Sequence, residues 1–542
     1  MNESFTDLKD AIAKGAFVDG AQTRIIDKDE QAREKWLFDF RNILLQPELL
    51  NRYAEIFWQL YASRYPFQVC GMESAAISLV SAIVMKSVER GTPVNGLYIR
   101  KSRKRQGLMK RIEGSPTSDP IILVDDLINS GGTFDKQVTV LADAGLHIVE
   151  IFALLAFRDK SAYDALNTPI KALFTLEDFG IPLLTQKTPE VVHNAFEVLW
   201  KFEAPNPSYN YVLPKSAPVT DERNVYFGSD AGIFYALDQN TGTIVWNFKV
   251  GKHTAEKGIF SSPALHNGIV YFGAYDGNVY ALDTKSGKEL WQYDRADWVG
   301  SSPAISEKLG LLFIGLEFGL FRKQGGVAAL NLTTGKEIWR AGTPKLTHSS
   351  PLYIEDENMV VIGSNDATVY AYRAGTGELV WRFNANGDVK ASFAYDKKRR
   401  LIFFGTLKGV LYALSVQGIP LYAKEVGAGM YSTPLVDKDT VYFASLDKCI
   451  YALDAGTGKE KWAFPTSGRI FASPVMIESS LWCGSNDGRL YEIAPASGTL
   501  RRSFQVSERI VNKITYNQTS KYFFVPTQAN EMYCILRKKK QL

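Results

Sequence analysis

The pattern of hydrophobic and polar positions divides the chain into two parts. In the first part, apolar runs such as residues 67–70, 121–124 and 148–156 alternate with amphipathic patterns such as residues 47–61 and 74–88. Strands that alternate with helices are typical of a parallel sheet flanked by helices. Beyond about residue 209 the chain shows only short apolar runs separated by turns, which predicts an all-β domain.

A Pro-rich stretch, Glu203–Ser208, separates the two patterns and is typical of a linker. At 542 residues the chain is long enough for two or more domains. We therefore predict an α/β domain over residues 1–204 and a β domain over residues 205–542.

The second part contains an internal repeat, in which a Thr-Gly-type hairpin is followed by an aromatic residue. The hairpin glycines are Gly242, Gly287, Gly335, Gly377, Gly418, Gly458 and Gly498. The residues four positions later are Trp246, Trp291, Trp339, Trp381, Tyr422, Trp462 and Arg502. The spacing of roughly 40 to 48 residues is that of a four-stranded propeller blade. We interpret the aromatic residues as packing between neighbouring blades and not as a site.

The ends of this repeat predict how the ring closes. The seven hairpins correspond to seven blades, and residues 513–537 can supply three further strands. We expect residues 209–213 to supply the missing strand of an eighth blade. Joining both ends of the domain in one blade would leave no exposed sheet edge.

One stretch of the first part carries the most specific chemistry. The apolar run Ile121–Val124 is followed by Asp125 and Asp126, and then by Ser130, Gly131, Gly132 and Thr133 before a predicted helix from Phe134. Glycines and hydroxyls between a strand and a helix N-terminus form a cradle for a phosphate. The two carboxylates would repel that phosphate, but they suit a ribose diol or Mg²⁺ nearby. The combination predicts binding of a ribose 5-phosphate.

A basic loop follows another predicted strand of the same part. It reads Arg100-Lys101-Ser102-Arg103-Lys104-Arg105-Gln106-Gly107. Such a run is usually an exposed face or a nucleic-acid patch. Next to an expected phosphate site, it can instead supply cations for further phosphate groups.

Composition and charge exclude several other classes of protein. The net charge is only +4, so we expect no large nucleic-acid surface. The cysteines, Cys70, Cys449, Cys483 and Cys534, lack the paired spacing of a zinc site or a disulfide framework. The acidic N-terminus does not look like a signal peptide, and no apolar run is long enough to span a membrane. We therefore expect a cytoplasmic protein.

Together these motifs resemble the signature of type I phosphoribosyltransferases, which use phosphoribosyl pyrophosphate (PRPP), and specifically that of orotate phosphoribosyltransferase. Arg100, Lys101, Lys104 and Gly107 match the basic loop of that family. The resemblance implies that Asp125 and Asp126 hold the ribose hydroxyls, that residues 130–133 bind the 5-phosphate, and that Arg158 contacts the base. It also implies Mg²⁺ held mostly through substrate and water, and a homodimer in which the loop reaches the neighbouring subunit's site.

The chain departs from that family at several positions. Gln106 replaces the loop histidine, and Glu73-Ser74 provides no lysine for the pyrophosphate. The Lys-Ser-Gly segment near the base pocket is also missing. The PRPP side therefore matches better than the base side.

The second part resembles propellers of the pyrroloquinoline-quinone (PQQ) type. The adjacent cysteine pair of the quinone enzymes is absent from this sequence, so we expect no PQQ. Propellers of this type also serve as binding platforms, and the fold alone does not fix a function.

The sequence therefore predicts a phosphoribosyltransferase that transfers 5-phosphoribosyl from PRPP to a pyrimidine-like base, with Lys104, Asp125 and Asp126 as catalytic residues. The attached propeller would act as a scaffold or bind a protein partner. The alternative is a non-catalytic sensor of PRPP or nucleotides whose propeller binds a partner. A quinone-dependent dehydrogenase is a third, weaker reading.

Overall fold

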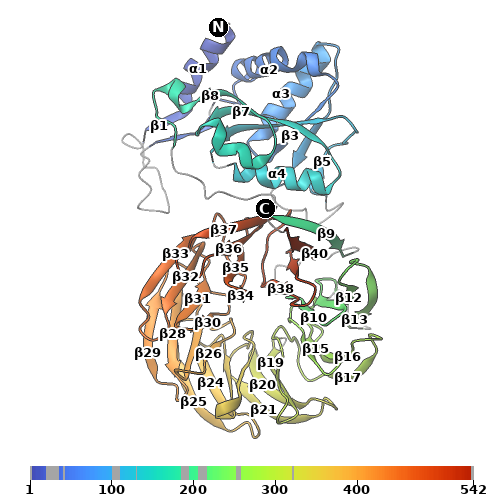
Figure 1. The fold of residues 1–542 in the computed structure, drawn as a ribbon, viewed down its shortest axis with the longest axis vertical. Helices are drawn as coiled ribbons and strands as arrows, with labels where there is room; N and C mark the ends of the chain where they lie inside the picture. Colours follow the sequence, from blue (N-terminus) through green and yellow to red (C-terminus); the bar gives the residue numbers. More distant parts are fainter. Residues whose placement is uncertain are drawn as a thin grey trace. The chain divides into compact units, whose positions relative to one another are not determined.

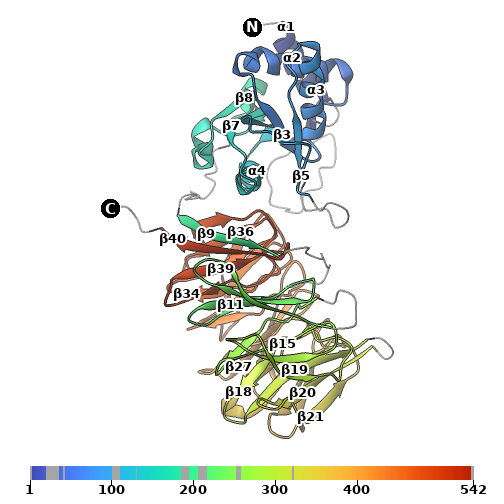
Figure 2. The ribbon, with the colours of Figure 1, turned by 90° about the vertical axis from the view of Figure 1, so that its right-hand side faces the viewer.

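The computed structural model describes residues 3–19, 36–40, 43–100, 110–129, 131–184, 195–204, 216–251, 258–319 and 323–538. The chain forms two compact units, Met1–Val191 and Val192–Leu542. The first is an α/β domain and the second is a β-propeller (Figures 1 and 2). This confirms the fold class that the hydrophobic pattern predicts.

The first unit is built on a six-stranded sheet with the order β5-β4-β3-β6-β7-β8. All neighbouring pairs are parallel except β4 and β5. The strands are β3 Gln68–Met72, β4 Gly96–Ile99, β5 Ile112–Glu113, β6 Ile121–Ile128, β7 Ile148–Ala156 and β8 Ile170–Thr175. A separate antiparallel pair consists of β1 Phe17–Asp19 and β2 Trp36–Phe38.

Different helices cover the two faces of this sheet. The helices are α1 Glu3–Gly15, α2 Pro47–Tyr61, α3 Ala76–Glu89 and α4 Gly132–Asp143, with 3₁₀ turns η2 Ala62–Arg64, η3 Lys160–Leu166 and η4 Leu176–Phe179. Ile122 and Val124 of β6 pack in one core with residues of α1, α2 and α3. Ile121 and Leu123 pack in a second core with residues of α4. Successive residues of a strand point to opposite faces, which is why β6 is apolar throughout this part.

The second unit consists of eight four-stranded antiparallel sheets, the blades of the propeller. Seven blades are made of consecutive strands. The first two are β10 Val219–Thr220, β11 Asn224–Gly228, β12 Ile233–Asp238 and β13 Ile244–Lys249, then β14 Ala264–His266, β15 Ile269–Gly273, β16 Val279–Asp283 and β17 Glu289–Tyr293. The third and fourth are β18 Ala304–Ser306, β19 Leu311–Phe318, β20 Gln324–Asn331 and β21 Glu337–Thr343, then β22 Leu352–Ile354, β23 Met359–Gly363, β24 Thr368–Arg373 and β25 Leu379–Asn384, with η5 Glu355–Glu357 between β22 and β23.

The fifth to seventh blades follow the same plan. They are β26 Ala394–Asp396, β27 Leu401–Gly405, β28 Val410–Ser415 and β29 Pro420–Glu425, then β30 Leu435–Asp437, β31 Thr440–Ala444, β32 Cys449–Asp454 and β33 Glu460–Pro465, and finally β34 Val475–Ile477, β35 Ser480–Gly484, β36 Arg489–Ile493 and β37 Leu500–Gln505.

The eighth blade joins the two ends of the propeller, but not with the strand that the sequence predicts. It contains β38 Thr515–Tyr516, β39 Tyr522–Pro526 and β40 Glu531–Arg537, with β9 Phe196–Glu203 as its outer strand. β9 runs antiparallel to β40, from Phe196 opposite Arg537 to Glu203 opposite Glu531. Residues 209–213, which we expected to close the ring, lie outside the described residues. The first domain thus ends near Val191 and not at residue 204.

The repeated aromatic residues join one blade to the next, as predicted. A Cβ atom added to Gly377 would lie 2.6 Å from the Trp339 ring of the preceding blade, and every hairpin glycine from Gly242 to Gly498 shows the same close contact. The Trp339 indole N–H also donates to the Ala374 carbonyl at 2.8 Å. Trp200 on β9 makes the corresponding contact with Gly242, so β9 supplies the joint between the eighth blade and the first.

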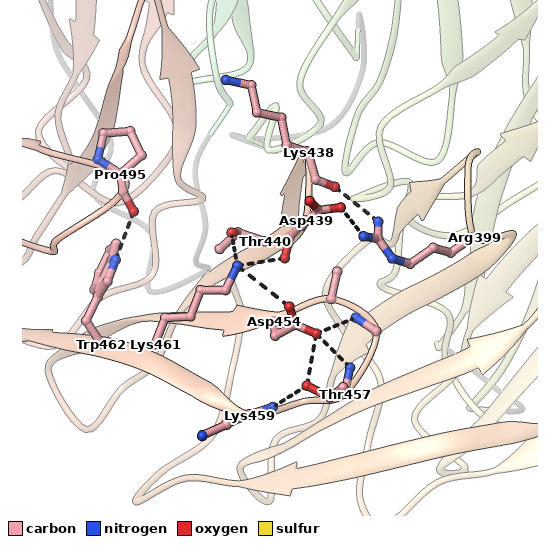
Figure 3. A network of polar contacts seen from close by, with 12 residues as sticks. Arg399, Lys438, Asp439, Thr440, Asp454, Thr457, Lys459, Lys461, Trp462 and Pro495 are labelled. Atoms are coloured by element: carbon pink, nitrogen blue, oxygen red, sulfur yellow. Dashed lines mark hydrogen bonds and ion pairs between the residues drawn. The ribbon is translucent and has the colours of Figure 1, made fainter.

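Ion pairs add to several of these joints. Arg399 of the fifth blade contacts Asp396 at 2.7 Å. It also pairs with Asp439 of the sixth blade (Figure 3). Between the seventh and eighth blades, where Arg502 replaces the repeated aromatic residue, the buried Glu492 pairs with Arg502 at 3.0 Å and with Arg537 of β40 at 2.7 Å. The joint between these two blades therefore contains charged groups where the others have an aromatic ring.

Candidate functional site

The strand order locates a candidate site in the first unit. From β3 the chain continues to β4 on one side, whereas β6, β7 and β8 follow on the other side. The order therefore reverses between β3 and β6, and ligands of open α/β sheets bind at the carboxyl ends of strands at such a point. Gly71 of β3 allows the close approach there, because a Cβ atom at this position would lie 2.7 Å from the Val124 carbonyl oxygen of β6.

Asp125 and Asp126 lie toward the carboxyl end of β6, as the sequence predicts. The Asp125 side chain is buried, whereas Asp126 is half-buried. A carboxylate oxygen of Asp125 accepts the backbone N–H of Asp126 at 3.0 Å. A buried carboxylate is costly unless it is hydrogen-bonded, so this contact helps to keep the pair in the strand.

The turn after β6 leads directly into the N-terminus of α4. Gly131 precedes the helix with a φ of 77°, a conformation that residues with a Cβ atom rarely adopt. Gly132 and Thr133 are the first two residues of α4, and the Asp135 N–H already bonds to the Gly131 carbonyl at 2.9 Å. The earlier amides of a helix have no partner within it, and together with the helix dipole they favour an anion. Ser130 lies outside the described residues.

Arg158 follows the neighbouring strand β7 and is held against the turn after β6. Its Nε donates to the backbone carbonyl of Asn129 at 3.1 Å and to the side-chain oxygen of Asn129 at 3.2 Å. The Arg158 backbone N–H bonds to the Tyr163 hydroxyl, which itself donates to the Ile128 carbonyl at 2.9 Å. The structure therefore brings Arg158 and the end of β6 together, through an asparagine that the sequence analysis did not single out.

Tyr53 of α2 is a second residue near the acidic pair that the sequence analysis did not single out. Its side chain is fully buried, and its hydroxyl has no hydrogen-bond partner in the described part of the chain. Desolvation raises the pKa of Tyr53 well above its usual value, and the charge of Asp125 raises it further. The Tyr53 phenol therefore stays protonated as a hydrogen-bond donor close to the acidic pair.

The basic loop begins and ends in an antiparallel pair. The Arg100 N–H bonds to the Arg111 carbonyl at 2.9 Å, and the Arg100 guanidinium lies 3.3 Å from a carboxylate oxygen of Glu113 on β5. Lys101 and Lys104 lie outside the described residues. The structure therefore describes the two strands that carry the loop, but not its lysines.

The acidic pair fits a metal ion that is held mainly by its substrate. Among the residues that the structure describes, no group of three or more His, Cys, Asp or Glu side chains could hold a metal ion. Asp125 and Asp126 provide two adjacent carboxylates, and Mg²⁺ commonly takes one or two carboxylates together with substrate phosphates and water. These residues therefore suit Mg²⁺ that arrives with a phosphorylated substrate.

Known proteins similar to the first unit are orotate phosphoribosyltransferases. The chain is 25% identical over 154 residues to that of a Bradyrhizobium species, an alignment that covers 27% of this chain and 83% of the relative. It is 33% identical over 116 residues to that of Sorangium cellulosum, which covers 20% of this chain and 60% of the relative. The similarity to orotate phosphoribosyltransferases therefore extends over most of the first unit and not only over its motifs.

The second unit matches the sequence profile of a family described as outer membrane protein assembly factor BamB, over residues 194–362, 323–400 and 365–541. Among solved structures, BamB from Moraxella catarrhalis superposes with a TM-score of 0.51 at 16% identity, covering 64% of this chain and 99% of that one. A quinohemoprotein alcohol dehydrogenase from Pseudomonas putida superposes with a TM-score of 0.53 at 16% identity, covering 66% of this chain and 79% of that one. At this identity the structures show a shared propeller fold and no more.

Proposed function

This chain belongs through residues 194–541 to the family described as outer membrane protein assembly factor BamB, and we propose that the domain preceding its propeller is a phosphoribosyltransferase of the orotate type. In the proposed reaction, a nitrogen of a pyrimidine-like base attacks C1 of PRPP, and pyrophosphate leaves. The propeller would serve as a scaffold or as the binding site of a protein partner.

A single observation carries this proposal. β6 leads from the acidic pair through Gly131, at a φ of 77°, into the N-terminus of α4. An anion-binding helix N-terminus beside two carboxylates suits a sugar phosphate, in which a phosphate and a diol lie one sugar's width apart. We assign the 5-phosphate to Ser130, Gly131, Gly132 and Thr133, and the ribose hydroxyls to Asp125 and Asp126.

The remaining roles concern the leaving group and the base. We assign pyrophosphate to Arg100, Lys101 and Lys104, because several cations are needed to neutralise it as the bond breaks. Arg158 is assigned to the base. Mg²⁺ bound with PRPP would neutralise part of the pyrophosphate charge, and Asp125 and Asp126 would orient it.

Two further features belong to the proposal. A homodimer is implied by the resemblance, because the basic loop of that family acts in the neighbouring subunit's site. Cys70, Cys483 and Cys534 form no disulfide, which fits a reducing compartment such as the cytoplasm. In the described part of the chain, no helix is both long and apolar enough to cross a bilayer.

Release of pyrophosphate from PRPP tests the reaction directly. The purified chain is incubated with PRPP, Mg²⁺ and one base at a time, including orotate, uracil and cytosine. We expect turnover with at least one pyrimidine-type base and a large loss of turnover in Asp126→Asn. Pyrophosphate release that is equally fast without any base would contradict base transfer.

A matched pair of glycines tests the phosphate site. Gly131 precedes α4 and Gly145 follows it, and their φ angles of 77° and 71° impose similar backbone strain on an alanine. A Cβ atom at Gly131 would also lie 3.3 Å from the Leu166 side chain, whereas Gly145 has open space. We expect Gly131→Ala to weaken PRPP binding strongly and Gly145→Ala to leave it unchanged. Equal effects of both substitutions would mean that the loss reflects stability and not the site.

The contacts of Arg158 favour a second candidate function, the non-catalytic sensor. Its Nε already bonds to both oxygens of Asn129, so part of the guanidinium is occupied before any base binds. A sensor would bind PRPP or a nucleotide with normal affinity and release no pyrophosphate with any base. PRPP binding by calorimetry, measured beside the turnover assay, distinguishes the two functions.

A further inference from the structure

A large cavity lies in the propeller, where its first strands meet. These innermost strands, such as β26, β30 and β34, lie toward the centre of the ring (Figure 1). The cavity has a volume of about 670 Å³, and its walls come from the segments that lead into the first strands of successive blades. Small-molecule sites typically occupy about 300–1,000 Å³, so this cavity has the size of a ligand site.

A ring of hydroxyl groups lines this cavity. Ser302 accepts the backbone N–H of Ser262 at 2.9 Å, and Ser350 accepts that of Ser302 at 2.8 Å. Ser473 accepts that of Thr433 at 2.8 Å in the same way. Each amide occupies a lone pair of a serine oxygen, and within the described chain none of these serine hydroxyls donates to an acceptor. Their protons are therefore available to a ligand.

Two lysines place positive charge in the same cavity. Lys390 precedes β26 and Lys513 precedes β38, so they reach the cavity from different blades. Neither ammonium group forms an ion pair with any residue that the structure describes, and none of the described residues lining the cavity is acidic. Water reaches the Lys513 side chain, but protein surrounds it on most sides, and this desolvation lowers its pKa.

Two acidic residues, Glu317 and Asp388, interact with other residues of the cavity wall. His348, a third basic side chain of the lining, pairs through Nδ1 with the buried Glu317 at 3.0 Å, so that carboxylate is already engaged. Asp388 acts on Tyr431, whose pKa is raised first by burial and then by that charge. Hydroxyl donors together with two lysines lacking ionic partners favour a ligand that accepts hydrogen bonds and carries negative charge.

We propose that the central cavity of the propeller binds a small polyanion, a molecule with at least two carboxylate or phosphoryl groups, between Lys390 and Lys513. One anionic group contacts each lysine, and the serine hydroxyls donate to the remaining oxygens. The site lies within the second unit and does not depend on phosphoribosyl transfer.

Binding is tested on the full chain with two probes, citrate for the carboxylate class and inorganic pyrophosphate for the phosphoryl class. Calorimetry gives the affinity of each probe. Because pyrophosphate is also expected to bind the first unit, calorimetry alone does not locate its site. The rate at which an amine-reactive ester acylates Lys513 is therefore followed by peptide mass spectrometry. We expect at least one probe to slow acylation of Lys513 but not that of Lys308, an exposed lysine outside the cavity.

Substitutions identify the contacts. Loss of one hydrogen-bonded charge should weaken binding by about 10- to 100-fold, so we expect that loss in Lys390→Gln and in Lys513→Gln, and none in Lys308→Gln. If Lys513→Gln does not fold, two results still test the proposal. The probe should protect Lys513 from acylation in the wild type, and this protection should be lost in Lys390→Gln. Failure of both probes to protect Lys513 at millimolar concentration, or equal protection in Lys390→Gln, would overturn the proposal.

Discussion

Removing the first domain at two different positions should give two very different proteins. A chain that starts at residue 205, where the sequence pattern predicts the second domain, lacks β9. A chain that starts at residue 192 retains it. We expect the longer chain to fold as a closed propeller and the shorter one to be strongly destabilised and to aggregate.

The size of the effect follows from the apolar side chains of β9. Phe196 is buried against Trp482. Trp200 packs on Gly242, and its indole N–H donates to the Gln239 carbonyl at 2.9 Å. Phe202 packs on Tyr235. Fully burying one large apolar side chain contributes about 1.5–3 kcal/mol. Because Trp200 and Phe202 are only half-buried, these three side chains contribute at most about 9 kcal/mol. That is comparable to the whole stability of about 5–15 kcal/mol of a typical domain. Loss of β9 also leaves β40 as an open edge that can pair with another chain.

Calorimetry and size-exclusion chromatography of the two truncated chains measure the difference. Trp200→Ala in the full chain removes only one of these contacts. It should lower the free energy of unfolding by about 3–5 kcal/mol if the ring of Trp200 fills the joint as tightly as a core residue. If both truncated chains are monodisperse and melt at the same temperature, β9 does not close the ring and the reasoning is wrong.

Three further predictions concern the loop, one ion pair and one joint. Lys104→Ala should lower turnover by about 100- to 1,000-fold with little change in PRPP binding, as expected for a contact made mainly in the transition state; wild-type turnover would refute this. Arg399 lowers the pKa of Asp439, so this carboxylate stabilises the fold above the usual pKa of aspartate, and the contribution is lost as the pH falls through the lowered value. Urea midpoints of Asp439→Asn and wild type should therefore differ at pH values near 7 and converge in acid, and a constant gap would contradict the assignment. Gly377→Ala should destabilise the propeller by about 2–4 kcal/mol, because it combines a left-handed backbone with a clash against Trp339, whereas Gly375→Ala in the same hairpin has open space and should change the melting temperature little.

The sequence predicted those features that depend on local patterns. Ile121–Val124 followed by Asp125, Asp126 and glycines predicted β6, its acidic end and α4, because the apolar run, the turn residues and the start of the helix all lie within a few neighbouring residues. Seven of the eight blades were predictable for the same reason, since each of them contains its own hairpin.

The features that the sequence did not predict depend on contacts between distant residues. β9 pairs with β40 across the whole second domain, and nothing in the Phe196–Glu203 pattern reveals that partner. The contact of Arg158 with Asn129 and the burial of Tyr53 near Asp125 likewise arise only when separate elements of the sheet and its helices pack together.

The pairing of β9 with β40 has a consequence for the order in which the protein can fold during synthesis. Phe196 must wait for Arg537, about 340 residues later in the chain, before the eighth blade can form. At a synthesis rate of about 5–20 residues per second, the apolar side chains of β9 stay without their partner for roughly 17–70 s. The first domain, which ends near Val191, can fold during this interval, so a folded α/β domain is tethered to a ring that cannot close until β40 has been made.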